Sequence, residues 1–194
     1  MRAMQFLYDK EFVAAKRPES ARAVAALYRS RGLSTDTAVE AGYLVHLGLA
    51  TVRAGEPALR LRRVLIVGPG LDLAPRTGLL EAVPPESYQP YAVVDSLLAL
   101  GLARLGDLEV VGADVNPRVV SHLQVARRRR GPLVFVSGIR ESESLTLDGE
   151  YRGYFEALGR QHGEALPPPA VAEADRGRLW KVVKVRPEVS NAIE

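Results

Sequence analysis

Three short apolar runs alternate with helical patterns in the middle of the chain, and this alternation limits the possible folds more than any other feature. The run Arg63–Val67 is almost continuously apolar and rich in β-branched residues, as in a strand that is buried on both faces. Similar runs follow at 108–113 and 133–137. Strand, helix, strand, helix and strand in this order predict a parallel α/β sheet with right-handed crossovers.

The helices between these runs carry ordinary start and stop signals. Pro90 stands at the start of a helical pattern over 90–105, where a proline is well tolerated. Asn116 and Pro117 open a second helix over 118–130, and Gly131 closes it. The boundaries therefore agree with the alternation.

The ends of the chain read differently from the middle. Residues 9–56 predict two or three helices, the last of them over 38–53 after the capping residues Ser34 to Asp36. We therefore expect a helical N-terminal extension over 1–58 and a cofactor-binding domain over 59–194. After Gly138 the patterns predict four weaker elements, namely a helix over 150–159, a loop over 166–178, a strand over 179–185 and a helix from 188.

Composition excludes several classes of protein. The chain has 194 residues, 47% of them apolar, and no cysteine, so disulfide frameworks and thiolate metal sites are excluded. The start does not resemble a signal peptide, and no apolar stretch approaches the roughly 20 residues that span a bilayer. His46, His122 and His162 show no metal-ligand spacing. We expect a cytoplasmic protein with no membrane partner and no metal.

Small and acidic residues follow the three apolar runs, where a parallel sheet binds its ligands. Gly68 and Gly70 follow the first run, Asp114 follows the second, and Ser137-Gly138 follows the third. Glycines let the backbone approach a ligand, and a carboxylate can accept the two hydroxyl protons of a ribose. This pattern predicts a nucleoside pocket.

A dinucleotide site fits the pattern less well. The motif G-x-G-x-x-G would place its third glycine at position 73, where this chain has Leu73. The acidic residue should also follow within about 20 residues, and Asp114 lies much farther on. A long loop from Leu71 to Gln89 delays the next helix.

Two segments resemble a known family. The first is Val64-Leu65-Ile66-Val67-Gly68-Pro69-Gly70, and the second is Val110-Val111-Gly112-Ala113-Asp114-Val115-Asn116-Pro117. Over residues 62–138 they are similar to the first two cofactor motifs of class I S-adenosylmethionine-dependent methyltransferases. The stretch Gln89-Pro90-Tyr91-Ala92-Val93 is loosely similar to the branch that methylates chemotaxis receptors.

The resemblance implies a Rossmann-like parallel sheet, S-adenosylmethionine as cofactor, and a set of cofactor-binding residues. These residues are Gly68, Pro69 and Gly70 in the turn, Asp72 just after it, Asp114 on the ribose and Val115 beside the adenine. The family usually carries an acid two positions before its first glycine, where this chain has Ile66, and Asp72 is the candidate for part of that role. No catalytic base and no methyl acceptor are identified.

Several of these features have simpler interpretations. Asp114 could cap the following helix, and Tyr88 and Tyr91 could pack in the core or close over a ligand. The run Arg127 to Arg130 complements the dipole at the end of its helix, and with a net charge of only +3 nucleic acid is not expected as a partner.

The leading hypothesis is an S-adenosylmethionine-dependent methyltransferase of unknown substrate. The alternatives are a nicotinamide-dependent oxidoreductase and a degenerate, non-catalytic binding module. The family's sheet has seven strands, whereas this sequence predicts three clearly and one weakly. We therefore expect an incomplete sheet and a chain that is the N-terminal part of a larger protein.

Overall fold

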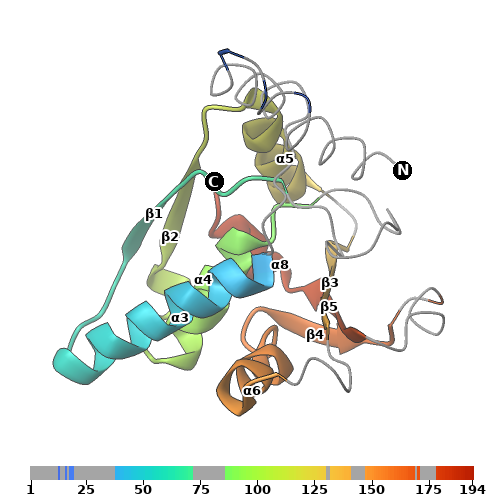
Figure 1. Ribbon diagram of the computed structural model, residues 1–194. Coiled ribbons are helices and arrows are strands. Elements are labelled where there is room, and N and C mark those ends of the chain that lie inside the picture. The colour runs from blue at the N-terminus through green and yellow to red at the C-terminus, as the bar shows by residue number, and fades with distance from the viewer. Residues whose placement is uncertain are drawn as a thin grey trace.

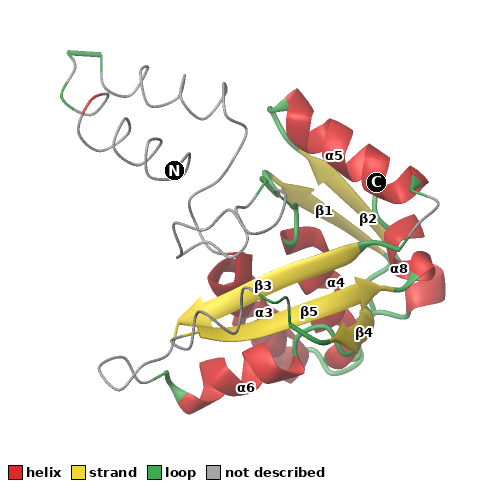
Figure 2. Ribbon diagram, turned by 90° about the vertical axis from the view of Figure 1, so that its right-hand side faces the viewer, coloured by secondary structure: helices red, strands yellow, loops and turns green. Residues whose placement is uncertain are grey.

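The computed structural model describes residues 38–71, 86–129, 132–140, 147–168 and 178–194, with isolated positions at 13, 16, 18, 19 and 170. These ranges contain both helices and strands, and the strands form two separate sheets (Figures 1 and 2). In chain order the elements are α3 (Ala38–Gly55), β1 (Arg63–Val67), α4 (Gln89–Ala99), η2 (Leu105–Asp107), β2 (Glu109–Ala113), α5 (Pro117–Arg128), β3 (Val134–Arg140), α6 (Gly149–Ala157), β4 (Gly163–Leu166), β5 (Arg178–Val185) and α8 (Pro187–Asn191).

The first sheet is a parallel pair. β1 runs beside β2 from the pair Arg63 and Glu109 to the pair Val67 and Ala113, with α4 as the crossover between them. The other edge of β2 binds residues 192–194. There the Val110 N–H donates to the carbonyl of Ala192 over 2.8 Å, and the Glu194 N–H donates to the carbonyl of Val110 over 2.8 Å.

The second sheet is antiparallel and has the order β3-β5-β4. β3 pairs with β5 over its whole length, from Val134 opposite Lys184 to Arg140 opposite Arg178. β4 pairs with the other edge of β5. Figure 2 shows β3 and β5 running side by side, apart from β1 and β2.

The prediction of a Rossmann-like parallel sheet is therefore wrong. The predicted strands at 63–67, 108–113 and 133–137 are present, but the third pairs antiparallel with β5 and lies in another sheet. Two observations explain this. Residues 192–194 occupy the edge of β2 that a third parallel strand would need, and β5 offers β3 a ladder of seven residue pairs.

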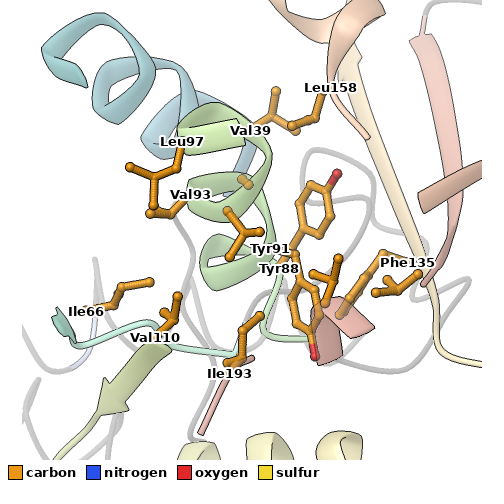
Figure 3. Packing of buried hydrophobic residues seen from close by; sticks show 14 of the residues in the cluster. Val39, Ile66, Tyr88, Tyr91, Val93, Leu97, Val110, Phe135, Leu158 and Ile193 are labelled. Atoms are coloured by element: carbon orange, nitrogen blue, oxygen red, sulfur yellow. The ribbon is translucent and has the colours of Figure 1, made fainter. Parts of the chain in front are cut away.

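α4 is the centre of the hydrophobic core. Every residue from Pro90 to Leu97 is buried, so this helix contacts other elements on all sides. Figure 3 shows Ile66 and Val110 of the parallel pair on one side of α4, and Phe135 of β3 near Tyr91 on the other. One core therefore joins the two sheets.

The tyrosines at the start of α4 pack in this core. The ring centroid of Phe135 lies 4.5 Å from that of Tyr91 and 5.2 Å from that of Tyr88. Both tyrosines are almost fully buried, and burial raises the pKa of Tyr91 to about 12. They are core residues in this structure.

α3 packs against α4, and Figure 1 shows the two helices side by side. Val39 belongs to the main core. Nδ1 of His46 lies 3.1 Å from the hydroxyl oxygen of Ser96. Apart from the isolated positions 13, 16, 18 and 19, the predicted helical extension before Ala38, including the capping residues Ser34 to Asp36, lies outside the described residues. The boundary at residue 58 stays a prediction.

The remaining boundaries differ by a few residues from the sequence prediction. α6 ends two residues before the end of the helix expected over 150–159, and α4 ends six residues before the end of the helix expected over 90–105. β5 covers the strand expected over 179–185. β4 was not predicted, because its four residues carry no alternation of apolar and polar side chains. In the described ranges no helix has the length and apolar character needed to cross a membrane.

Candidate functional site

The turn after β1 has the backbone that its glycines permit. Gly68 and Gly70 have φ angles of 70° and 68°, in the left-handed region that glycine adopts at little cost. The Gly68 N–H donates to the carbonyl of Ala113 over 2.7 Å, which keeps the turn attached to the end of β2. Pro69 between them is buried. The turn is thus held beside β2.

The residue after the turn anchors it from the other side. Leu71 is 7% exposed and packs with Val119 and Leu123 of α5 in a small apolar cluster. Leu123 also limits the space over Gly112, where an added Cβ would come within 2.8 Å of its Cδ1 atom. The turn, β2 and the first half of α5 therefore form one packed unit.

Asp114 lies where the turn and α5 meet. Its Oδ2 accepts a hydrogen bond from the Gly70 N–H over 3.2 Å, and its Oδ1 accepts one from the Asn116 N–H over 2.8 Å. The carboxylate also stands just before the N-terminus of α5, where negative charge is stabilised. The two bonds use only part of its capacity, because a carboxylate offers about four acceptor sites. Further acceptor sites remain for hydroxyl donors.

Asn116, and not Asp114, caps α5. The Asn116 side chain accepts a hydrogen bond from the Arg118 N–H over 3.0 Å, and Pro117 occupies the first turn. Asp114 instead orders the turn that precedes the helix. Its hydrogen bond from Gly70 joins the segment after β2 to the turn after β1, which a simple helix cap would not do.

The turn is open in front of Gly68. A Cβ added at Gly68 would meet no atom within 4 Å, and Val115 is fully exposed. The predicted site residues Gly68, Pro69, Gly70, Asp114 and Val115 therefore come together at one edge. Asp72 lies outside the described residues.

The third predicted part of the pocket is not at this edge. Ser137 and Gly138 lie inside β3, opposite Lys181 and Trp180 of β5, and the strand continues to Arg140. The expectation that they end a third strand of the same sheet is wrong. They cannot flank a base as the end of a neighbouring parallel strand would.

A second polar group, which the sequence did not single out, lies at the start of α4. The buried Glu86 carboxylate accepts hydrogen bonds from the Val136 N–H over 3.0 and 3.3 Å. The Ser87 N–H donates to Nε2 of His122 over 3.3 Å, and burial lowers the pKa of this histidine. These contacts fasten the start of α4 to β3 and to α5.

A sequence signal for this group existed. Glu86 and Ser87 are a polar pair three and two residues before the first residue of α4, Gln89, just ahead of the region where helix start signals are sought. Their partners could not be read from the sequence, since Val136 and His122 lie on other elements. His122 acts as an acceptor here, so its Nε2 carries no proton in this arrangement.

Comparisons with known proteins gave no match for this chain. No protein-family model matches the chain, and neither does any curated protein or solved structure. In the described part of the chain, no three His, Asp or Glu side chains gather as metal ligands would.

Proposed function

We propose that this protein binds the nucleoside part of S-adenosylmethionine at the edge formed by Gly68–Gly70 and Asp114, and that it is a methyltransferase. One observation carries the proposal. The Asp114 carboxylate accepts a hydrogen bond from the Gly70 N–H in a turn with two left-handed glycines, one of which, Gly68, faces open space, at the end of two paired parallel strands. The Rossmann-like sheet is not part of the proposal.

The residues present fit such a ligand. The backbone at Gly68 has no side chain and no neighbour in front of it, so a ribose or methionine chain can approach closely. The free lone pairs of Asp114 suit the two hydroxyl groups of a ribose. Val115 offers an apolar side chain in full contact with solvent, on which a flat base can rest.

The chain's own groups would supply binding and orientation. S-adenosylmethionine, when bound, supplies an electrophilic methyl group on a sulfonium ion. Transfer of a methyl group depends mainly on holding donor and acceptor in line. The packing of Leu71 against α5 and the two hydrogen bonds of Asp114 keep the binding edge rigid. No described residue is assigned as a base.

Calorimetric titration with S-adenosylhomocysteine and with NADH tests the proposal. We expect the wild-type chain to bind S-adenosylhomocysteine and not NADH. Asp114→Ala should weaken the binding of S-adenosylhomocysteine about tenfold or more, because the two hydrogen bonds from the ribose hydroxyls to the charged carboxylate are lost. Asp114→Asn keeps an oxygen acceptor and should lose less.

Asp148→Ala is the matched control. Asp148 caps α6 by accepting hydrogen bonds from the N–H groups of Glu150 over 2.9 Å and Tyr151 over 3.3 Å. Its loss removes a carboxylate with two backbone bonds, as at Asp114, but away from the candidate site. An equal loss of affinity in both variants would contradict a direct role for Asp114.

The same titrations separate the alternatives. Binding of NADH alone would favour a nicotinamide-dependent oxidoreductase and overturn the methyltransferase proposal. The titrations use the same chain whose structure is described. The absence of heat with either ligand would therefore favour a binding module without cofactor.

A further inference from the structure

A basic cleft lies at the opposite end of α5 from the candidate site. It has a volume of about 370 Å³ and lies between the end of α5, the start of β3, the end of β5 and α8. Figure 2 shows α8 close to the end of β5 and the start of β3. α5 has 12 residues and rises roughly 1.5 Å per residue, so the two places are separated by most of its length.

The cleft combines positive charge with an apolar surface. Arg127 and Arg129 come from the end of α5, and Lys184 comes from β5. The buried side chains of Leu133 and Val185 also line it. The described residues that line the cleft include no Asp or Glu. Its charge is therefore unbalanced within the cleft itself.

The nearest carboxylates stand outside the cleft and hold its cations weakly. Glu194 pairs with Arg127 over 2.6 Å, with nearly half of each side chain exposed. Glu164 is 4.0 Å from Lys184 and largely exposed. Exposed pairs of this kind contribute about 0–1 kcal/mol, so a stronger anion can replace the carboxylate. Arg129 has no acidic partner in the described part of the chain.

We propose that this cleft binds the phosphate group of a small phosphorylated molecule whose apolar part rests on Leu133 and Val185. Guanidinium groups match the geometry of phosphate oxygens with paired hydrogen bonds. The volume is within the range of about 300–1,000 Å³ that holds small ligands. The partly apolar lining favours a small molecule over a nucleic-acid backbone, which is usually met by an extended basic stripe.

The site is independent of the proposed methyltransferase activity. It shares no residue with the turn at Gly68–Gly70 or with Asp114. The sequence predicts only that Arg127 to Arg130 complement the helix dipole. The cleft could not be part of that prediction, because the other walls of the cleft come from three further elements of the fold.

An NMR titration of the 194-residue chain with inorganic phosphate and with phenyl phosphate tests the proposal. We expect saturable shifts at the amides of Leu133 and Val185 and tighter binding of phenyl phosphate, whose ring would cover them. Arg129→Gln should weaken binding about tenfold or more, since a charge-assisted hydrogen bond is lost. Glu194→Gln should tighten binding, because it removes the competing carboxylate from Arg127. Binding should also weaken as ionic strength rises.

Arg104→Gln is the control for net charge. Arg104 is exposed, precedes η2 and does not line the cleft, so this variant loses one positive charge elsewhere. It should bind phenyl phosphate as the wild type does, and the dispersed spectrum of each variant shows that it is folded. Three results would overturn the proposal. They are no saturable shifts, equal weakening in Arg129→Gln and Arg104→Gln, or binding of a short oligothymidylate without binding of phenyl phosphate.

Discussion

The two sheets of this protein use similar apolar strands for different purposes. In the parallel pair, Leu65 and Val67 of β1 are 63% and 78% exposed, and the polar groups gather where the strands end. In the antiparallel sheet, β3 is buried from Phe135 to Ile139, and its small residues Ser137 and Gly138 lie inside the ladder. The first sheet therefore presents backbone and carboxylate to solvent, whereas the second mainly stabilises the core.

The difference follows from strand direction. Parallel strands end at the same edge, so the turn after β1 and Asp114 after β2 meet without any help from distant segments. Antiparallel neighbours end at opposite edges, so residues at their ends are separated. The candidate site belongs to the parallel pair for this reason.

α4 carries the strongest link between the two regions, and breaking it should have the largest effect. Asp95 is 5% exposed and accepts backbone N–H bonds from Gly159, Gln161 and His162 over 2.8 to 3.1 Å. Asp95→Ala leaves these donors without an acceptor, two of them on the buried residues Gly159 and His162, so we expect the free energy of unfolding to fall by about 3–5 kcal/mol. Urea denaturation measures this change.

Asp107→Ala supplies the control for loss of a carboxylate, because Asp107 is exposed. Its effect should stay within about 0.5 kcal/mol. If Asp95→Ala and Asp107→Ala were equally stable, the turn between α6 and β4 would not depend on the hydrogen bonds of Asp95 for its contact with α4.

The second prediction concerns close packing inside the antiparallel sheet. A Cβ at Gly163 would contact Val183 Cγ1 and stand 2.5 Å from the carbonyl oxygen of Lys184. Gly163→Ala should therefore destabilise the protein by about 1–3 kcal/mol, as overpacking does. Thermal or urea unfolding measures the change.

Gly153 is the matched position for this test. It lies inside α6, is exposed, and an added Cβ there would meet nothing within 4 Å. Gly153→Ala should stabilise the protein by about 0.5–1 kcal/mol, because alanine favours a helix over glycine. Destabilisation of both variants to the same extent would argue against close packing as the cause at Gly163.

The comparison also shows what could be predicted from the sequence. The run Arg63–Val67 and the cap Asn116-Pro117 carry strong local signals, and the structure has β1 and α5 there. The expectation that the first strand is buried on both faces is wrong, because Leu65 and Val67 are exposed. Gly68, Gly70 and Asp114 could be placed together because both strands were recognised and a parallel pair brings their ends to one edge. Local patterns were sufficient for this part.

Strand partners could not be predicted in the same way. The run at 133–137 was correctly expected to be a strand, but nothing in Leu133 to Ser137 specifies whether the neighbour is β2 or β5. That choice depends on residues 192–194, which occupy the edge of β2 from far along the chain. The roles of Glu86 and Asp95 depend on tertiary contacts as well, with Val136 and with the turn at 159–162.

In the parallel region, the third prediction separates backbone conformation from packing. Gly68 has a φ of 70°, but the space where its Cβ would lie is empty. Gly68→Ala should cost about 1–2 kcal/mol from left-handed strain alone. Gly68→Asn should cost less in urea denaturation, because asparagine tolerates this conformation better. Equal costs for Ala and Asn would indicate a packing effect and contradict the open space in front of the turn.

The smallest expected effect is a pH dependence that differs between the two histidine environments. Burial lowers the pKa of His122 below the ordinary value of 6.5, and among the described residues no carboxylate opposes this shift. Burial also lowers the pKa of His46, but the charge of Asp95 raises it in part. A lowered pKa means that the unfolded chain binds the proton more readily, so the stability present above pH 6.5 is lost as the pH falls through the folded-state pKa.

Urea denaturation across this range should therefore show a free energy of unfolding that declines below about pH 6.5. His122→Gln should flatten this decline, since the Nε2 acceptor of the Ser87 N–H then cannot be protonated. His46→Gln should flatten it less, because Asp95 already offsets part of the shift at His46. A steeper contribution from His46 than from His122 would reverse the expected order and place the acid-sensitive contact at α3 instead of beside the candidate site.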